Sequence, residues 1–191
     1  MSSLQNSIKK SYSNDVQHYL ECTEQIYPPI WLVMNELTLG TSIHLYKLMS
    51  KSNKREISDY FGCKSDELVS WLESINLIRN ICCHNGILSD FKLRTKAKIP
   101  KEYKTNSSLG NILLKNDSGI YTNRLAFQLC VIVKLMSKIN NKYAYKDLKI
   151  SIKKLLDSHT TPEYYGFQNA EAIDKLFDLN STESTDTLIA Y

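Results

Sequence analysis

Apolar residues recur along this chain mainly at helical spacing. Leu68, Trp71, Leu72 and Ile75 stand at i, i+3, i+4 and i+7, so they line one face of a helix. Residues 124–139 are apolar nearly all round, which predicts a central buried helix. The pattern therefore predicts an all-α fold.

Cap and turn residues divide the rest of the chain into further helices. Ser, Thr, Asp and Asn favour helix starts, Pro is tolerated in a first turn, and Gly favours helix ends. These signals predict three helices in the first part of the chain: from Ser13 to before Pro28, from Pro29 to Gly40, and from Thr41 or Ser42 through Leu48. A helix over 54–62 and a second helix from Ser65 are predicted to form a hairpin. Two later helices are predicted over 145–156 and 169–179.

The expected domain organisation is simple. Residues 1–12 are polar and predicted to be flexible, 13–180 are predicted to form a single domain, and 181–191 are predicted to be a polar tail. Residues 86–119 are rich in Lys, Asn and Ser, which predicts a long basic loop with a turn of helix at 109–114.

Composition agrees with a helical protein of ordinary globular character. Among 191 residues 42% are hydrophobic, and 6 Gly and 4 Pro leave little material for a turn-rich sheet protein. The net charge of +4 permits RNA, DNA or an acidic partner without requiring one. The 5 Cys are an odd number that fits reduced thiols, and no segment reads as a signal peptide or membrane span. We therefore expect a cytoplasmic protein with no membrane partner.

An arginine and a histidine interrupt the apolar segment at residues 77–86. On a helix Arg79 and His84 lie about 140° apart around the axis. If the helix from Ser65 continues unbroken, Arg79 falls within the upstream apolar stripe, where an unpaired guanidinium would be costly. Either the helix is interrupted near Asn76, or the stripe faces an interface where Arg79 meets an anion. A structural ion pair, with Asp90 as partner, and a half-buried histidine are the simpler alternative.

The stretch Arg79-Asn80-Ile81-Cys82-Cys83-His84 resembles the Arg-Asn-x-x-x-His signature of HEPN-type nucleases. Its sequence is similar to that of the Abi-like (abortive infection) family of bacterial anti-phage proteins. The resemblance covers about residues 13 to 170. Further segments similar to that family occur in the same order along the chain: Pro28-Pro29-Ile30-Trp31, Glu36-Leu37-Thr38-Leu39-Gly40, Ile57-Ser58-Asp59-Tyr60-Phe61-Gly62, Trp71-Leu72 and Tyr165-Gly166-Phe167.

This resemblance implies a HEPN-like helical bundle that cleaves RNA without a metal ion or other cofactor, in abortive infection or toxin–antitoxin growth arrest. His84 would be the general base or acid, Arg79 the clamp on the scissile phosphate, and Asn80 would orient the histidine or the phosphate. The implied partners are RNA, a second copy of the chain, and an RNA or protein antitoxin. Ile87 and Ser89 stand where family members resemble one another in a basic and an aromatic residue, so a non-catalytic RNA- or protein-binding module is the second hypothesis.

Basic residues just after His84 are candidate RNA contacts. Lys92, Arg94, Lys96 and Lys98 alternate with other residues in a pattern that could guide an RNA backbone toward the site. A solvated, lysine-rich loop explains the same residues equally well.

Two other functional interpretations are weaker. Residues 56–68 fit a helix-turn-helix of a DNA-binding regulator, but Asp66 and Glu67 at the start of its second helix would repel phosphate. A zinc site at Cys82, Cys83 and His84 is disfavoured because adjacent cysteines diverge on a helix, and we expect no metal. The remaining histidines lack a convergent partner and are left out of the site: His18, His44 and His159.

Overall fold

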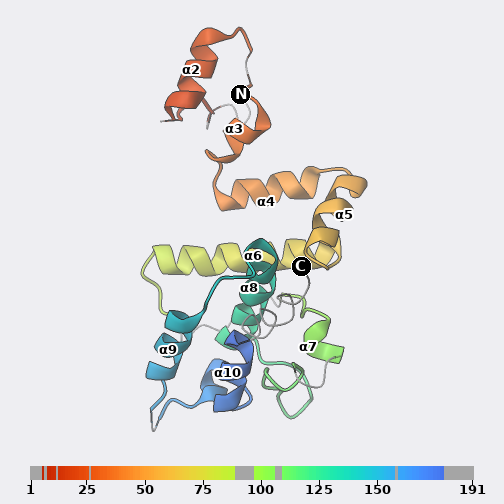
Figure 1. The fold of residues 1–191 in the computed structure, drawn as a ribbon, viewed down its shortest axis with the longest axis vertical. Coiled ribbons are helices and arrows are strands. Elements are labelled where there is room, and N and C mark those ends of the chain that lie inside the picture. Colours follow the sequence, from red (N-terminus) through yellow and green to blue (C-terminus); the bar gives the residue numbers. More distant parts are fainter. Residues whose placement is uncertain are drawn as a thin grey trace, which may run out of the picture. The chain divides into compact units, whose positions relative to one another are not determined.

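The structure, a computed structural model, describes residues 6, 8–11, 13–25, 27–88, 97–105, 109–157 and 159–178 (Figure 1). Within these ranges the ordered elements are helices, and the extended pairing consists of isolated β-bridges, so the predicted all-α class is confirmed. None of the helices in the described ranges has the length and apolar character to cross a membrane. The chain divides into two compact units, Met1–Ser50 and Lys51–Tyr191, which are described separately below. The single domain over 13–180 stays a prediction.

The first unit contains α2 (Asn14–Cys22), α3 (Ile30–Met34) and α4 (Leu39–Leu48). The predicted helix end at Gly40 and the predicted cap at Thr41 or Ser42 are wrong, because Gly40 lies inside α4. Thr38 caps this helix instead, since its hydroxyl oxygen accepts the Thr41 N–H at 3.2 Å.

A small apolar cluster holds α2 and α3 together. Val16 of α2 and Leu32 and Val33 of α3 are buried with Ile8, which lies in the segment expected to be flexible. Next to them the Ser11 hydroxyl donates to the Glu36 carboxylate at 2.6 Å. Apolar burial and one charge-assisted hydrogen bond thus stabilise this unit.

The second unit contains a helical hairpin followed by a helical layer. Its elements are α5 (Lys51–Tyr60), α6 (Ser65–Cys83), α7 (Glu102–Thr105), α8 (Leu125–Ile139), α9 (Lys146–Lys154), the 3₁₀ helix η1 (Pro162–Tyr165) and α10 (Ala170–Phe177). The predicted hairpin, the buried helix after residue 124 and the last helix after Asn169 are therefore confirmed, with ends shifted by at most three residues.

The turn between α5 and α6 follows from Gly62. This glycine has φ +66°, and its N–H donates to the Asp59 carbonyl at 2.9 Å, while the Cys63 N–H donates to the Ser58 carbonyl at 3.1 Å. The two bonds form a Schellman motif, which ends α5 and leads directly into α6.

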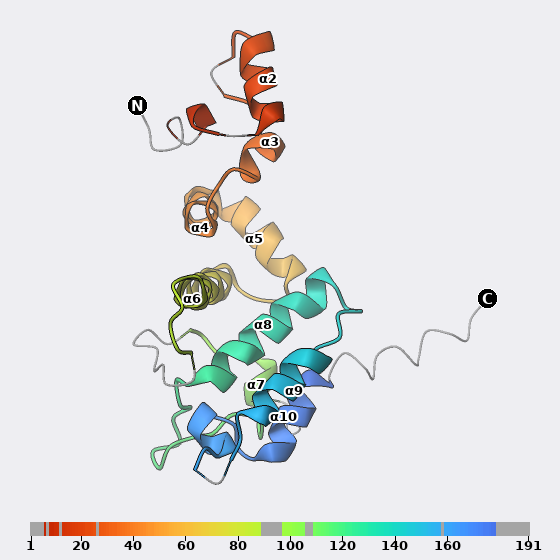
Figure 2. The same cartoon turned by 90° about the vertical axis from the view of Figure 1, so that its left-hand side faces the viewer.

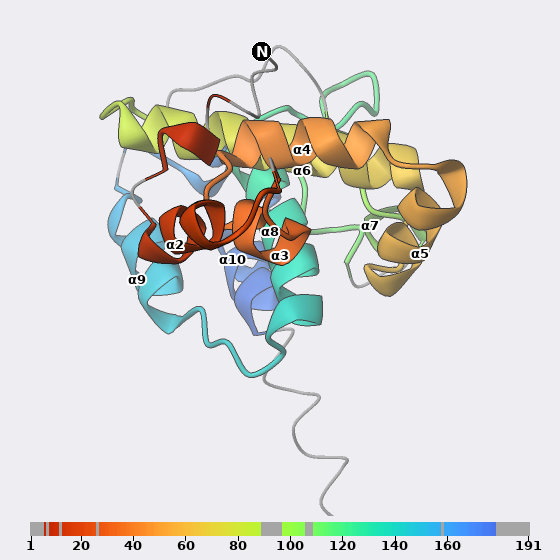
Figure 3. The same cartoon turned by 90° about the horizontal axis from the view of Figure 1, so that it is seen from above.

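Helix α8 is the centre of the second unit. It packs against α6 on one side and α10 on the other, and α9 packs on α10 (Figure 2). Figure 3 shows α8 crossing beneath α6 at a steep angle. Leu68 and Trp71 of α6 are each 1% exposed, and the Ser74 hydroxyl donates to the buried Gln128 side chain of α8. The buried residues of α8 are Ala126, Phe127, Gln128, Leu129, Cys130, Val131, Val133 and Leu135.

Some described residues within 86–119 contribute to this core, whereas residues 115–119 are exposed. Ile112 is fully buried, and Leu113 forms an isolated antiparallel bridge with Phe167. The Trp71 ring N–H donates to the Lys98 carbonyl, which fixes residues 97–99 along α6. The predicted turn of helix at 109–114 is reduced to a single turn at 109–112, in which the Ile112 N–H donates to the Leu109 carbonyl at 3.1 Å. The following backbone bonds to the chain after η1 instead.

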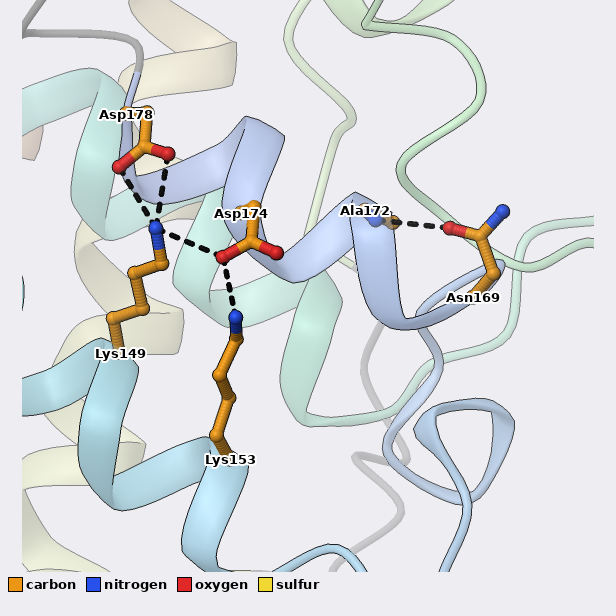
Figure 4. A network of polar contacts seen from close by, with 6 residues as sticks. All are labelled: Lys149, Lys153, Asn169, Ala172, Asp174 and Asp178. Atoms are coloured by element: carbon orange, nitrogen blue, oxygen red, sulfur yellow. Dashed lines mark hydrogen bonds and ion pairs between the residues drawn. The ribbon is translucent and has the colours of Figure 1, made fainter.

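An ion-pair network joins α9 to α10 (Figure 4). Lys149 lies 2.8 Å from the Asp174 carboxylate and 2.9 Å from that of Asp178, and Lys153 lies 2.6 Å from Asp174. Asn169 caps α10 by accepting the Ala172 N–H at 2.9 Å. Hydrogen bonds from Lys149 and Lys153 lower the pKa of Asp174, so this carboxylate is charged throughout the neutral range.

Candidate functional site

The candidate motif lies on a single unbroken helix. α6 runs from Ser65 to Cys83 without a break, which excludes the first of the two alternatives considered from sequence, an interruption near Asn76. The buried positions of α6 are Leu68, Trp71 and Ser74. Because they are three residues apart and a helical turn has about 3.6, each lies on a slightly different side of the helix from the one before. Arg79 stands about 140° around the axis from Ser74, and its side chain is exposed. The guanidinium therefore avoids the core without any interruption of the helix.

A Schellman motif ends α6 immediately after His84. Asn85 has φ +54°, and its N–H donates to the Cys82 carbonyl at 3.2 Å. The Gly86 N–H donates to the Ile81 carbonyl at 2.8 Å. Asn tolerates the left-handed conformation better than most residues that carry a Cβ, so the sequence Asn-Gly closes the helix here. The backbone of His84 is consequently held on both sides.

Gly86 is also required by close packing. A Cβ on this residue would lie 2.7 Å from Ile81 Cγ2 and 3.1 Å from the Ile81 carbonyl oxygen. Asn85 and Gly86 are thus supporting residues that the analysis of the sequence missed, although Asn-Gly after a helix is a recognisable end signal.

Asn80 contacts both other members of the motif. Its side-chain oxygen accepts a hydrogen bond from Arg79 Nη1 at 3.2 Å, and its backbone carbonyl accepts the His84 N–H at 3.0 Å. Its amide therefore orients the arginine rather than the histidine ring. Arg79 and His84 are both exposed, about 7.5 Å apart along the helix axis.

The charge of Arg79 is not neutralised by a carboxylate in the described part of the chain. Asp90, the partner considered from sequence, lies outside the described residues. A guanidinium in this state presents its remaining N–H donors to solvent, and these donors match the geometry of a phosphate.

The surroundings of the motif are partly apolar and exposed. Cys82 and Cys83 are exposed free thiols, Leu77 is 36% exposed, and Ile87 is 68% exposed. Side chains of this kind around two polar groups are suited to exclude water when a second surface covers them.

The predicted RNA contacts are not brought to this motif where the structure describes them. Lys98 pairs with Asp66, and its N–H donates to the Ser70 hydroxyl at 3.0 Å. Asp66 stands 18 residues before His84 on α6, which corresponds to about 27 Å of helix. Lys92, Arg94 and Lys96 lie outside the described residues. Because residues 97–99 lie along the first turns of α6, this helix is also poorly placed to enter a DNA groove.

Metal-binding side chains do not converge in the described ranges, where no group of three or more His, Cys, Asp or Glu residues could hold an ion. Cys63 stands before the start of α6 and the Cys82–His84 stretch at its end. His18 lies beside Cys22 at 3.6 Å in the first unit, and both are exposed.

The fold and the motif define an all-helical protein that carries an exposed Arg-Asn-x-x-x-His sequence at a helix end. The family model described as Abi-like protein matches residues 1–90, which include α2 to α6 and all three motif residues. Over these residues the chain is similar to the Abi-like family, in agreement with the resemblance of its sequence. The searches of curated proteins and of solved structures found no match.

Proposed function

We propose that this chain is an abortive-infection-type protein that binds RNA and cleaves it without a metal ion. The Abi-like match supports the abortive-infection-type role. The cleavage proposal depends on one observation: Arg79 and His84 are both exposed on one rigid helix end, and Asn80 contacts both of them. The HEPN-like assignment comes from the resemblance of the motif and is part of this proposal.

The proposed chemistry is transfer of the phosphodiester to the neighbouring ribose 2′-oxygen. The 2′-oxygen forms a bond to phosphorus as a base removes its proton, and the bond from phosphorus to the 5′-oxygen breaks as an acid supplies a proton there. An imidazole ring can accept a proton at one nitrogen or donate one, so His84 serves in either role. Arg79 stabilises the charge that develops on the phosphate oxygens.

A homodimer follows from this chemistry, because one chain supplies one imidazole in the motif and the reaction uses an acid and a base. Two copies facing one RNA provide both. The exposed apolar side chains of Leu77 and Ile87 beside the motif suit contact with a second copy. An RNA or protein antitoxin is the remaining partner in this proposal.

The test is cleavage of mixed RNA by purified protein in the presence of EDTA. We expect cleavage by the wild-type protein, products with cyclic phosphate and 5′-hydroxyl ends, and loss of cleavage in His84→Ala and Arg79→Ala. His159→Ala is a matched control, because His159 is an exposed histidine whose backbone N–H, not its ring, bonds to Asp157. Cleavage that persists in both motif variants would remove the assigned roles.

A non-catalytic RNA- or protein-binding module is the second candidate. It is favoured by Ile87, an apolar side chain that is 68% exposed at a position where the family resemblance implies a basic residue. RNA binding without cleavage by the wild-type protein, reduced in Arg79→Ala, would support this candidate over the enzyme.

A further inference from the structure

A basic pocket lies at the α5–α6 hairpin, at the opposite end of α6 from the Arg79–His84 motif. It is an open pocket of about 430 Å³, a volume within the range of ligand-binding pockets. Six of its seven lining residues are charged or carry a hydroxyl group, whereas pockets for apolar ligands are lined mostly by apolar and aromatic side chains. The lining residues are Lys51, Arg55, Ser58, Asp59, Cys63, Lys64 and Ser65.

Positive charge dominates this lining. Lys51, Arg55 and Lys64 contribute three cations, and Asp59 contributes one anion. Arg55 meets Asp59 through Nε at 3.5 Å, which leaves its two terminal nitrogens for another acceptor. Lys51 and Lys64 form no ion pair with any residue that the structure describes. The pocket therefore has an excess of donors suited to an anion.

The two acids at the start of α6 do not cancel this charge. Asp66 pairs with Lys98, and Glu67 accepts the Lys64 N–H at 2.8 Å. From sequence, these acids were the reason to expect phosphate to be repelled from this hairpin. In the structure each is already engaged by a cation or a backbone donor, and neither lines the pocket.

The floor of the pocket is rigid and uncharged. Ser58 is 1% exposed, its hydroxyl donates to the Arg55 carbonyl at 3.0 Å, and it lies 3.1 Å from the Ser65 hydroxyl. Burial, and secondarily the charge of Glu67, raises the pKa of Cys63 to about 11, so this thiol adds no negative charge at neutral pH. Together with the Schellman turn at Gly62, these contacts keep the pocket wall fixed before any ligand binds.

We propose that the pocket formed by Lys51, Arg55 and Lys64 binds a phosphate monoester, carried either by a free nucleotide or by the 5′ end of an RNA chain. The three cations line an open pocket whose volume exceeds that of a phosphate group and leaves room for an attached nucleoside. A terminal phosphate carries more charge than a phosphate within a chain, so it gains most from three converging cations. This binding does not depend on cleavage at His84.

The test is calorimetric titration of the full chain with AMP, with 5′-phosphorylated RNA and with the same RNA bearing a 5′-hydroxyl. We expect AMP to bind, with a Kd that rises with salt, and to bind at least about tenfold more weakly to the variant Lys51→Gln/Arg55→Gln/Lys64→Gln. A matched control is Lys142→Gln/Lys146→Gln/Lys175→Gln, which removes the same charge from exposed positions outside the pocket.

The RNA arm separates the two sources of phosphate. If the 5′-phosphorylated RNA binds more tightly than the 5′-hydroxyl RNA, and the pocket variant loses the difference, the ligand is an RNA end. Equal binding of the two RNAs together with pocket-dependent AMP binding assigns a free nucleotide. The proposal is overturned if AMP and both RNAs fail to bind, or if the control variant weakens binding as much as the pocket variant.

A measurement on the wild-type protein covers the case in which the triple variant fails to fold. Titration with AMP should shift the backbone amide NMR signals of Ser58, Cys63 and Ser65 more than those of α10. Shifts spread evenly over the chain, or absent at the hairpin, would overturn the pocket assignment. Because neither readout measures RNA cleavage, the proposal survives or fails separately from the nuclease.

Discussion

The end of α6 allows a quantitative prediction for Gly86→Ala. The new Cβ would lie 2.7 Å from Ile81 Cγ2 and 3.1 Å from the Ile81 carbonyl oxygen, closer than carbon atoms pack. φ of Gly86 is not in the left-handed region, so steric overlap, not backbone strain, is the cost. Overpacking of this kind typically costs about 1–3 kcal/mol.

Two smaller effects adjust this value. Relief of the overlap lengthens the 2.8 Å bond from the Gly86 N–H to the Ile81 carbonyl, which costs about 1 kcal/mol. Replacement of glycine by alanine restricts the unfolded chain and returns about 0.4–1 kcal/mol. We therefore expect Gly86→Ala to lower the free energy of unfolding by about 2 kcal/mol, and Tm by about 4–8 °C for a chain of this size.

The assay is thermal unfolding followed by circular dichroism, combined with a double-mutant cycle. Ile81→Ala removes Cγ2, so the double variant Ile81→Ala/Gly86→Ala should lose less stability than the sum of the two single variants. RNA cleavage should fall in Gly86→Ala because the turn that holds His84 shifts. An unchanged Tm in Gly86→Ala, or strict additivity in the cycle, would refute the reasoning.

Two further predictions concern the second unit. Asp174→Asn removes a carboxylate that pairs with both Lys149 and Lys153 of α9. It should lower the free energy of unfolding at pH 7, measured by urea titration, by only about 1 kcal/mol, because these side chains are partly screened by solvent. Its lysine partners lower the pKa of Asp174, so the ion pairs stabilise the fold when the pH is above 3.8, the ordinary pKa of the carboxyl group, and this stabilisation is lost as the pH falls below that value. A wild-type protein that is still more stable than Asp174→Asn at about pH 2 would contradict this account. In a thiol-reactivity assay the exposed Cys82 and Cys83 should react at once, whereas Cys130, which is fully buried and whose pKa burial raises, should react only on unfolding. Rapid reaction of all thiols in the folded protein would be inconsistent with the buried α8.

The hydrophobic pattern was sufficient to predict a helix where one face or the whole circumference of that helix is buried. α8 is apolar nearly all round and is the buried centre of its unit, and Gly62 and Asn169 mark helix ends as their residue types predict. These features depend on local chemistry, which a sequence displays directly.

The sequence was insufficient where tertiary contacts decide the structure. The lysine-rich composition of 97–119 concealed the burial of Ile112 and Leu113, which bond to the chain near Phe167 more than fifty residues later. Gly40 is typical of a helix end, but it lies in the first turn of a helix that the Thr38 hydroxyl caps.

The candidate site was predictable in part. The motif could be found from residue types and spacing. The regular apolar pattern of the helix, however, predicted that Arg79 faces the core, whereas the face that is buried in the structure runs through Leu68, Trp71 and Ser74. Which face of a long helix is buried depends on the helices packed against it, here α8, and not on its own sequence alone.

The central claim is that Arg79 and His84 act directly on RNA, and the most direct test is the rate of RNA cleavage in EDTA for wild-type protein and His84→Ala under single-turnover conditions. Removal of a general acid or base should lower this rate by about 10²–10⁴-fold, with His159→Ala unchanged. If wild-type and His84→Ala cleave at the same rate, the motif is not the catalytic centre.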